Sequence, residues 1–441
     1  MASKGNDMDA VYVNNYRGFS KTTLPILPVN FFVGENSTGK TSLLALLELL
    51  ANHNFWFRLD FNLSPYEFGG YKDIVSIGSS DQREFQLGLL ERNDKDPTES
   101  MCYMMHFREG ENGLPKLVFL SHYCNGQLAT MWLSRTRVGV RLQTGLPPLS
   151  DWPAAEDVFG YLQEEPARPK IGYKFLPPNG RSFARRSPIT ALPGYLSELF
   201  GDTPCAELTE SIGFPLLAHR FAGLAPIRTT PRRTYDGYAK PWSADGQHTP
   251  YVIRSSLSSN KQGAHDFVEA LNTFGDNSGL FQTIGVKKFG RTAASPFELN
   301  VSLGGHALRV NSVGYGVSQV LPVAVEALVQ SRAWLAIQQP EVHLHPKAQA
   351  ALGNLLYQAA YVGSNTLFVE THSDYILDRF RLAMREGNPP SNFAHVCYFE
   401  RSAEINKIHF MRINELGEYP EDQPKGFREF FLMEQKKLLG L

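Results

Sequence analysis

The chain has 441 residues, of which 42% are hydrophobic, and its 43 basic and 44 acidic side chains leave a formal net charge of -1. This length is too great for one compact core, so we expect two lobes or a head with an insertion. The balanced charge excludes a globally basic nucleic-acid-binding protein. Four cysteines without a C-x-x-C pair indicate reduced thiols rather than a disulfide framework or a zinc site.

The sequence carries no sign of a membrane or export segment. The first ten residues are polar, and no apolar run approaches the roughly 20 residues that span a bilayer. We therefore expect a cytoplasmic protein with no membrane contact.

The N-terminal part predicts a strand, a glycine-rich loop and a helix in succession. A first strand is expected at 11–13, and a second runs over 24–33 into GENSTGKT at 34–41. The leucine-rich stretch that follows predicts a helix to about Asn52.

The glycine-rich loop has the composition of a phosphate-binding loop. Gly34 and Gly39 allow the backbone N–H groups to point inward at phosphates, Lys40 can reach the β and γ phosphates, and the Thr41 hydroxyl can ligate magnesium. The flanking strand and helix are the context this loop requires. The sequence therefore predicts binding of ATP or GTP.

The middle of the chain is expected to be mostly β-structure and loop. Alternating segments predict antiparallel strands at 84–90, 116–121, 128–134 and 138–143. Residues 145–205 are rich in proline and predict an irregular insertion with a short helix near 152–163.

A second glycine-rich segment, NSVGYGVSQVLPVAVEAL, covers 311–328. A helix at 264–274 and strands at 297–302 and 307–310 precede it. A glycine-serine turn at a helix N-terminus can hold an anion through N–H groups and the Ser318 hydroxyl. An ordinary junction of loop and helix is the alternative.

Two further apolar strands end in polar residues. The strand at 333–337 is followed by Gln338, Gln339 and, after Pro340, Glu341, and the strand at 366–369 is followed by Glu-Thr-His-Ser. Because nucleotide chemistry lies at the carboxyl ends of parallel strands, we expect these residues and the glycine-rich loop to share one cleft.

His343 and His345 raise the question of a metal site. No third ligand follows at a recognisable spacing, so the preferred interpretation is the start of a helix with Pro346 in its first turn.

The order GENSTGKT, VGYGVSQ, QQPEVHLHP and ETHSDYIL resembles the ABC-type ATPase heads of the SMC, RecF and OLD-like group, and among them the AAA-type ATPases of bacterial defence systems. The segments NNYRGF at 14–19 and LAPIRTTPRRTY at 224–235 and the tail after Ile413 resemble the same group. The resemblance covers about 1–90 and 215–441. It implies an α/β head with a mixed sheet and a β-rich insertion between the Walker A loop (GENSTGKT) and the signature segment (VGYGVSQ).

The resemblance also implies roles for individual residues. The signature segment would touch the γ-phosphate held by a second subunit, and His372 would sense that phosphate. The implied ligands of ATP are Gly34, Asn36, Ser37, Gly39, Lys40, Thr41, Ser42, Gly314, Gly316, Ser318 and Gln319, those of Mg²⁺ are Thr41 and Gln338, and the catalytic set is Gln338, Gln339, Glu341 and His372.

One departure from the group affects hydrolysis. The Walker B strand normally ends in two acids, whereas here Gln338 and Gln339 stand at those positions, and glutamine cannot act as a general base. Three explanations stay open: Glu341 replaces the missing acid through a shifted water, the protein is a slow or non-hydrolysing switch, or one glutamine is an engineered trap. Slow hydrolysis with Glu341 involved is preferred.

The expected domains are 1–90 and 216–385, forming the head, with an insertion at 91–215 and a small extension at 386–441.

Only about 70 residues follow His372, without the acid cluster of a TOPRIM nuclease. The resemblance therefore implies a homo-oligomeric sensor subunit, similar to the ATPase of PARIS-like anti-phage systems, with a separate TOPRIM or HNH nuclease as effector and a phage protein as trigger.

Two basic segments are candidates for other contacts. Residues 168–186 hold six basic residues and no acid, interleaved with aromatic residues, which indicates either a nucleic-acid patch or a solvated loop. Arg228, Arg232 and Arg233 have either a structural role or a phosphate contact.

The rival hypothesis is a RecF-like repair or chromosome-maintenance ATPase that binds DNA through 168–186. The aromatic tail around Phe427, Phe430 and Phe431 is interpreted as core or subunit contact.

Overall fold

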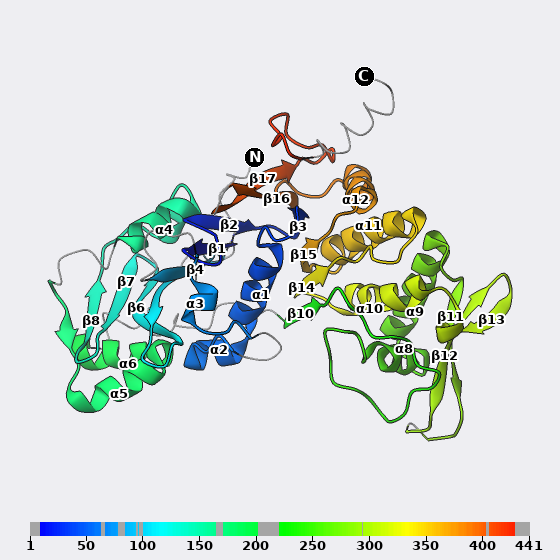
Figure 1. Ribbon diagram of the computed structural model, residues 1–441, viewed down its shortest axis with the longest axis horizontal. Helices are drawn as coiled ribbons and strands as arrows, with labels where there is room; N and C mark the ends of the chain where they lie inside the picture. The colour runs from blue at the N-terminus through cyan, green and yellow to red at the C-terminus, as the bar shows by residue number, and fades with distance from the viewer. Residues whose placement is uncertain are drawn as a thin grey trace. The chain divides into compact units, whose positions relative to one another are not determined.

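The computed structural model describes residues 9–62, 67–77, 84–93, 96, 100–164, 171–201, 220–292, 294–402 and 405–427 (Figure 1). The chain divides into two compact units. Unit 1 comprises 1–27, 35–218 and 399–408, and unit 2 comprises 28–34, 219–398 and 409–441. No helix of the described residues is long and apolar enough to cross a membrane.

Unit 1 is built on an antiparallel sheet of eight strands in the order β2-β1-β4-β5-β6-β7-β8-β9. Its strands are β1 Asp9–Asn14, β2 Thr22–Ile26, β4 Phe85–Glu91, β5 Met101–Glu109, β6 Pro115–Cys124, β7 Gln127–Leu133, β8 Val138–Gln143 and β9 Lys174–Phe175. Its helices are α1 Lys40–Ala51, α2 His53–Arg58, α3 Tyr71–Ile74, α4 Ala155–Gln163, α5 Pro178–Arg186 and α6 Pro188–Phe200.

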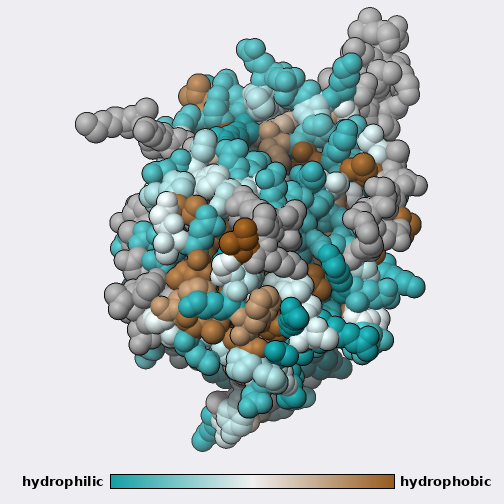
Figure 2. Space-filling view, turned by 90° about the vertical axis from the view of Figure 1, so that its left-hand side faces the viewer, coloured by the Kyte–Doolittle hydropathy of each residue, from teal (hydrophilic) through white to brown (hydrophobic). Residues whose placement is uncertain are grey.

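Helix α4 covers part of the sheet of unit 1. The ring of Phe159 stacks on Tyr12 with centroids 5.2 Å apart, and a cluster of buried residues from β1, β5 and β6 surrounds them. Figure 2 shows hydrophobic side chains gathered among hydrophilic ones on one side of the molecule. In unit 1, Phe175 and Phe183 are exposed.

The structure confirms most predicted elements of unit 1 and corrects three. The single strand expected at 24–33 is two strands, because the chain leaves one sheet at Leu27 and enters another after Pro28. Strand β5 was not predicted, because six consecutive buried residues give it no alternation. The stretch 145–205 contains the short helix predicted near 152–163, which is α4, but also the helices α5 and α6, which were not predicted.

Unit 2 contains a mixed sheet in the order β10-β14-β15-β3-β16-β17 and a three-stranded sheet, β11-β12-β13. The strands are β3 Val29–Gly34, β10 Arg220–Leu224, β11 Thr283–Lys288, β12 Phe297–Leu303, β13 His306–Arg309, β14 Ala333–Gln338, β15 Thr366–Glu370, β16 Ala394–Ser402 and β17 Ile405–Ile413. The helices are α8 Thr249–Leu257, α9 Gln262–Ser278, α10 Tyr315–Val329, α11 Pro346–Tyr361 and α12 Asp374–Gly387. The last four residues of β16 and the first four of β17 belong to unit 1.

Four adjacent strands of this sheet, β10, β14, β15 and β3, run parallel. Their register pairs Gln338 with Glu370 and Glu370 with Phe32, so the carboxyl ends of three strands lie at one edge. Strands β14 and β15 are almost wholly buried, as expected for a parallel sheet covered by helices. The predicted α/β class with a mixed sheet, and the β-rich insertion, are confirmed.

Candidate nucleotide-binding site

The glycine-rich loop connects the end of β3 at Gly34 to the start of α1 at Lys40. Its backbone has positive φ at three positions, 141° at Gly34, 64° at Ser37 and 95° at Gly39. At Gly39 a Cβ would lie 2.5 Å from the ring of Phe19, so only glycine fits there. The loop thus places its N–H groups at the N-terminus of a twelve-residue helix, where an anion is favoured.

Lys40 is held inside the curl of this loop. Its side chain is 3% exposed, and Nζ donates to the carbonyl oxygen of Glu35 at 2.6 Å, where the Thr38 hydroxyl also donates at 2.8 Å. Thr41, Asn36 and Ser37 are exposed. The ammonium group is therefore fixed beside the N–H groups that a phosphate would contact.

A second group of predicted site residues lies within unit 2, at the ends of β14 and β15. Glu341 bridges the two strand ends: one carboxylate oxygen accepts from the Thr371 hydroxyl at 2.8 Å, and the other accepts from the backbone N–H of His372 at 2.7 Å. The imidazole of His372 is exposed. Glu341 thereby connects the segment after β14 to the residue that the resemblance identifies as the phosphate sensor.

Gln338 and Gln339 differ in their surroundings. Gln338 is 8% exposed, whereas Gln339 turns away from the strand with a φ of 44° and donates its N–H to the Glu370 carbonyl at 2.7 Å. The positive φ of Gln339 redirects the chain so that Glu341 can reach the end of β15.

Glu370 is an acid at this edge to which the sequence analysis assigned no role. It is 5% exposed and is the register partner of Gln338 on the neighbouring strand. Register partners on adjacent strands point to the same face of a sheet, so a carboxylate lies beside the neutral Gln338. Its position directly before Thr371 and His372 is the feature of the sequence from which Glu370 could have been predicted. Carboxylate oxygens suit Mg²⁺ better than an amide does, so Glu370 is a candidate ligand in addition to those that the resemblance implies.

Arg228 joins this strand end to the signature helix. It is 2% exposed, and its two terminal nitrogens donate to the backbone carbonyls of Gln338 at 2.7 Å and Gln319 at 3.3 Å. Burial lowers the pKa of Arg228 to about 10, although the Glu341 carboxylate acts to raise it. Of the two roles left open for Arg228, the structure shows the structural one.

The signature segment begins helix α10 with Gly314 as its N-cap. At Gly316 a Cβ would lie 2.7 Å from the His343 carbonyl, so the helix start packs closely on the segment after β14. The Ser318 hydroxyl donates to the Tyr315 carbonyl at 2.7 Å, and Gln319 donates to the Arg228 carbonyl at 3.4 Å. Gly314 and Tyr315 are exposed, whereas Ser318 and Gln319 are buried.

His343 and His345 have structural partners in this region. His345 caps α11 by accepting the N–H of Lys347, with Pro346 at the first helical position, as the sequence predicts. The ring of His343 lies 4.9 Å from that of Tyr315. Among the described residues no group of three or more His, Cys, Asp or Glu side chains could hold a metal ion.

The basic segment 168–186 forms a helix rather than a loop over its second half. Arg181 donates to the carbonyls of Leu176 at 2.9 Å and Thr136 at 3.0 Å, and Arg185 donates to that of Ser134 at 3.0 Å. These arginines fasten α5 to the turn between β7 and β8. Arg168, Lys170 and the tail residues Phe430 and Phe431 lie outside the described residues.

Two segments of the chain are similar to ATPase family models. Residues 8–95 match a family described as "AAA ATPase domain", and residues 235–378 match one described as "AAA domain, putative AbiEii toxin, Type IV TA system". The first match contains the glycine-rich loop. The second contains the residues at the ends of β14 and β15, here called the strand-end cluster: Gln338, Glu341, Glu370 and His372. Both matches support an ATPase that binds nucleotide. No curated protein matches the sequence.

Solved structures with similar coordinates are SMC head domains. An SMC head bound to the C-terminal winged-helix domain of ScpA has 10% identity and a TM-score of 0.46, covering 92% of this chain and 98% of that one. The head domain from Thermotoga maritima has 10% identity and a TM-score of 0.40, with coverages of 91% and 98%. The head from Pyrococcus furiosus, bound to the C-terminal domain of ScpA, has 9% identity and a TM-score of 0.44, with coverages of 98% and 99%. These likenesses are distant.

Proposed function

We propose that this chain is a slow ATPase that acts as a sensor subunit, pairing with a second copy around ATP and controlling a separate effector protein. The observation that carries the proposal is the presence of two acids, Glu341 and Glu370, at the edge of the sheet where the two Walker B acids are replaced by glutamine.

Each residue of the site has a part in this proposal. The N–H groups of the glycine-rich loop and Lys40 bind the phosphates of ATP, and Thr41 holds Mg²⁺, with Gln338 or Glu370 supporting it. Glu341 orients or deprotonates the attacking water. Because Glu341 accepts from the N–H of His372, a movement of His372 toward the γ-phosphate also moves Glu341.

The biological role rests on the resemblance and on the description of one matched family. The segment 235–378 is similar to a family named for a putative toxin of a Type IV TA system. With the defence-system ATPases that the motifs resemble, this favours a role in anti-phage defence with a nuclease as effector and a phage protein as trigger.

The RecF-like alternative depends on DNA binding by 168–186. Two of the arginines in that segment already bind backbone carbonyls of their own unit, which leaves them less available to phosphates. The sensor hypothesis is therefore preferred.

The test is ATP hydrolysis by the chain and by Glu341→Gln, Glu370→Gln and Gln339→Glu, with Lys40→Ala as the background. We expect measurable hydrolysis by the unaltered chain and a loss of about 100-fold in Glu341→Gln, the contribution of a general base. Glu370→Gln should raise the Mg²⁺ concentration needed for half-maximal hydrolysis, and it should change the affinity for ATP less. Full turnover in Glu341→Gln would reject the role of Glu341, and turnover in Lys40→Ala equal to that of the unaltered chain would reject the nucleotide site.

A further inference from the structure

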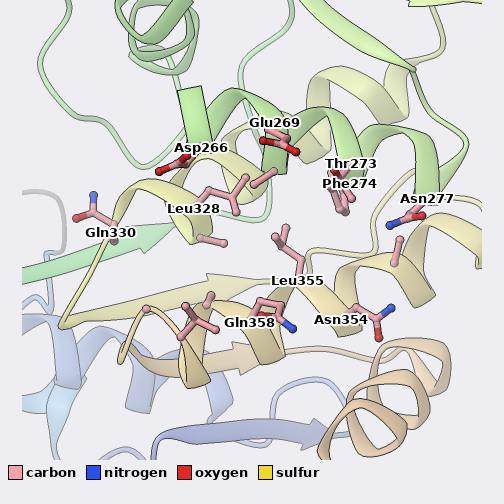
Figure 3. A pocket seen from close by; sticks show the side chains of 16 residues that line it. Asp266, Glu269, Thr273, Phe274, Asn277, Leu328, Gln330, Asn354, Leu355 and Gln358 are labelled. Atoms are coloured by element: carbon pink, nitrogen blue, oxygen red, sulfur yellow. The ribbon is translucent and has the colours of Figure 1, made fainter. Parts of the chain in front are cut away.

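A groove lies between helices α9, α10 and α11 of unit 2. Its volume is about 540 Å³. Figure 3 shows Leu328 of α10 and Leu355 of α11 in the space between the helices, with Asp266 and Glu269 along α9.

The groove lies at the end of the sheet opposite the candidate nucleotide site. It is lined by Gln330, which precedes β14, and by Gly363, which precedes β15, whereas Gln338 and Glu370 end those strands. A ligand in the groove would therefore leave the strand-end cluster uncovered.

The floor of the groove is apolar and includes four small side chains. Ala270, Ala327, Ala351 and Ala359 line it together with Phe274. Small side chains allow the backbone of another helix to approach closely, and the space between them accepts apolar side chains spaced along one helical face.

The rim of the groove is acidic. Asp266 and Glu269 are exposed on α9, and no lysine or arginine occurs among the described residues that line the groove. The buried Glu326 accepts from His248 at 2.7 Å, and from Gln330 Nε2, also at 2.7 Å. Gln330 itself lines the groove, so a buried carboxylate lies one side chain behind its surface.

We propose that this groove binds a basic amphipathic helix of a partner protein. Leucine or phenylalanine side chains on one face of that helix fill the space between α10 and α11, while lysine or arginine side chains on its flank meet Asp266 and Glu269. The charge complementarity and the apolar floor select this ligand over an acidic or wholly polar one. The inference goes beyond the proposed ATPase function and does not depend on it.

The probe is a fluorescein-labelled peptide of two copies of the heptad Leu-Lys-Lys-Leu-Leu-Lys-Leu, which presents one apolar and one basic face as a helix. Its binding to the full chain is measured by fluorescence anisotropy. We expect saturable binding that is weakened at least about tenfold by Asp266→Lys combined with Glu269→Lys, and similarly by Ala270→Trp, which fills the groove. A peptide of the same composition with its leucines spread around the helix should bind at least about tenfold more weakly.

Matched controls lie on the same helix outside the groove. Asp276→Lys changes an exposed acid and Ala264→Trp enlarges a half-buried alanine, and both should leave the affinity within about twofold. Equal binding of the two peptides, or an effect of Asp276→Lys as large as that of the rim variants, would show general charge attraction and overturn the proposal. ATP hydrolysis by the same variants reports separately on the nucleotide site.

Discussion

Arg228 makes a residue-scale prediction because its charge is buried against backbone carbonyls. Arg228→Met removes the donors to Gln338 and Gln319 and leaves both carbonyl oxygens without these partners. We expect the free energy of unfolding to fall by about 2–4 kcal/mol. Arg228→Lys keeps the charge but not the planar fork of donors, so its free energy of unfolding should lie between those of the unaltered chain and Arg228→Met.

The measurement for Arg228 is urea unfolding followed by circular dichroism. Arg232→Met is the matched control, because Arg232 is exposed in the same loop, and it should shift the free energy of unfolding by no more than about 0.5 kcal/mol. Equal effects of Arg228→Met and Arg232→Met would contradict the assigned role.

The pairing of strands β4 and β5 makes a prediction at the scale of elements. Glu84 precedes β4 and faces two residues of β5, His106 and Arg108. Burial acts to raise the pKa of Glu84, but hydrogen bonds from His106 and Gln86 and the charge of Arg108 lower it from 4.5 to about 2. The carboxylate lies 2.6 Å from His106 Nδ1 and 3.0 Å from an Arg108 nitrogen.

A lowered carboxyl pKa makes this stabilisation depend on pH in one direction. It is fully present above about 4.5 and is lost as the pH falls toward 2, because the unfolded chain then binds the proton more tightly. Glu84→Gln should destabilise the chain by about 1–2 kcal/mol at pH 7, after allowance for partial exposure, with a smaller difference at pH 3.

The measurement for Glu84 is thermal unfolding of both proteins from pH 7 to pH 3. Glu111→Gln is the control, since Glu111 and its partner Arg135 are both exposed. A Glu84→Gln effect that stays constant over this range would show that the charge contributes nothing.

The elements also show which features the sequence could predict. The strand β8, whose sequence Val-Gly-Val-Arg-Leu-Gln alternates, and the helix start at Pro346 follow from local patterns. The break between β2 and β3 did not, because both strands are apolar and only their sheet partners differ. At the site, the motifs identified Glu341 as a candidate, but its contacts with Thr371 and His372 depend on strand register, and so does the position of Glu370 beside Gln338.

At the scale of the whole molecule, the signature segment predicts an effect of ATP on assembly. Its buried Ser318 hydroxyl is bonded within its own helix turn, while Gly314 and Tyr315 are exposed. We expect ATP and Mg²⁺ to raise the particle mass of the unaltered chain, and Ser318→Ala to bind ATP as well as the unaltered chain but to lose at least half of the assembled fraction.

The physical reason is that the Ser318 hydroxyl can exchange the Tyr315 carbonyl for a phosphate presented by a second subunit, whereas alanine cannot. Light scattering with and without ATP and Mg²⁺ gives the assembled fraction, and a labelled nucleotide gives the affinity. Ser312→Ala, an exposed serine just before the helix, is the control and should assemble normally. If Ser318→Ala assembled as fully as Ser312→Ala, the pairing would not pass through the signature helix, and the exposed Tyr315 would be the next position to change.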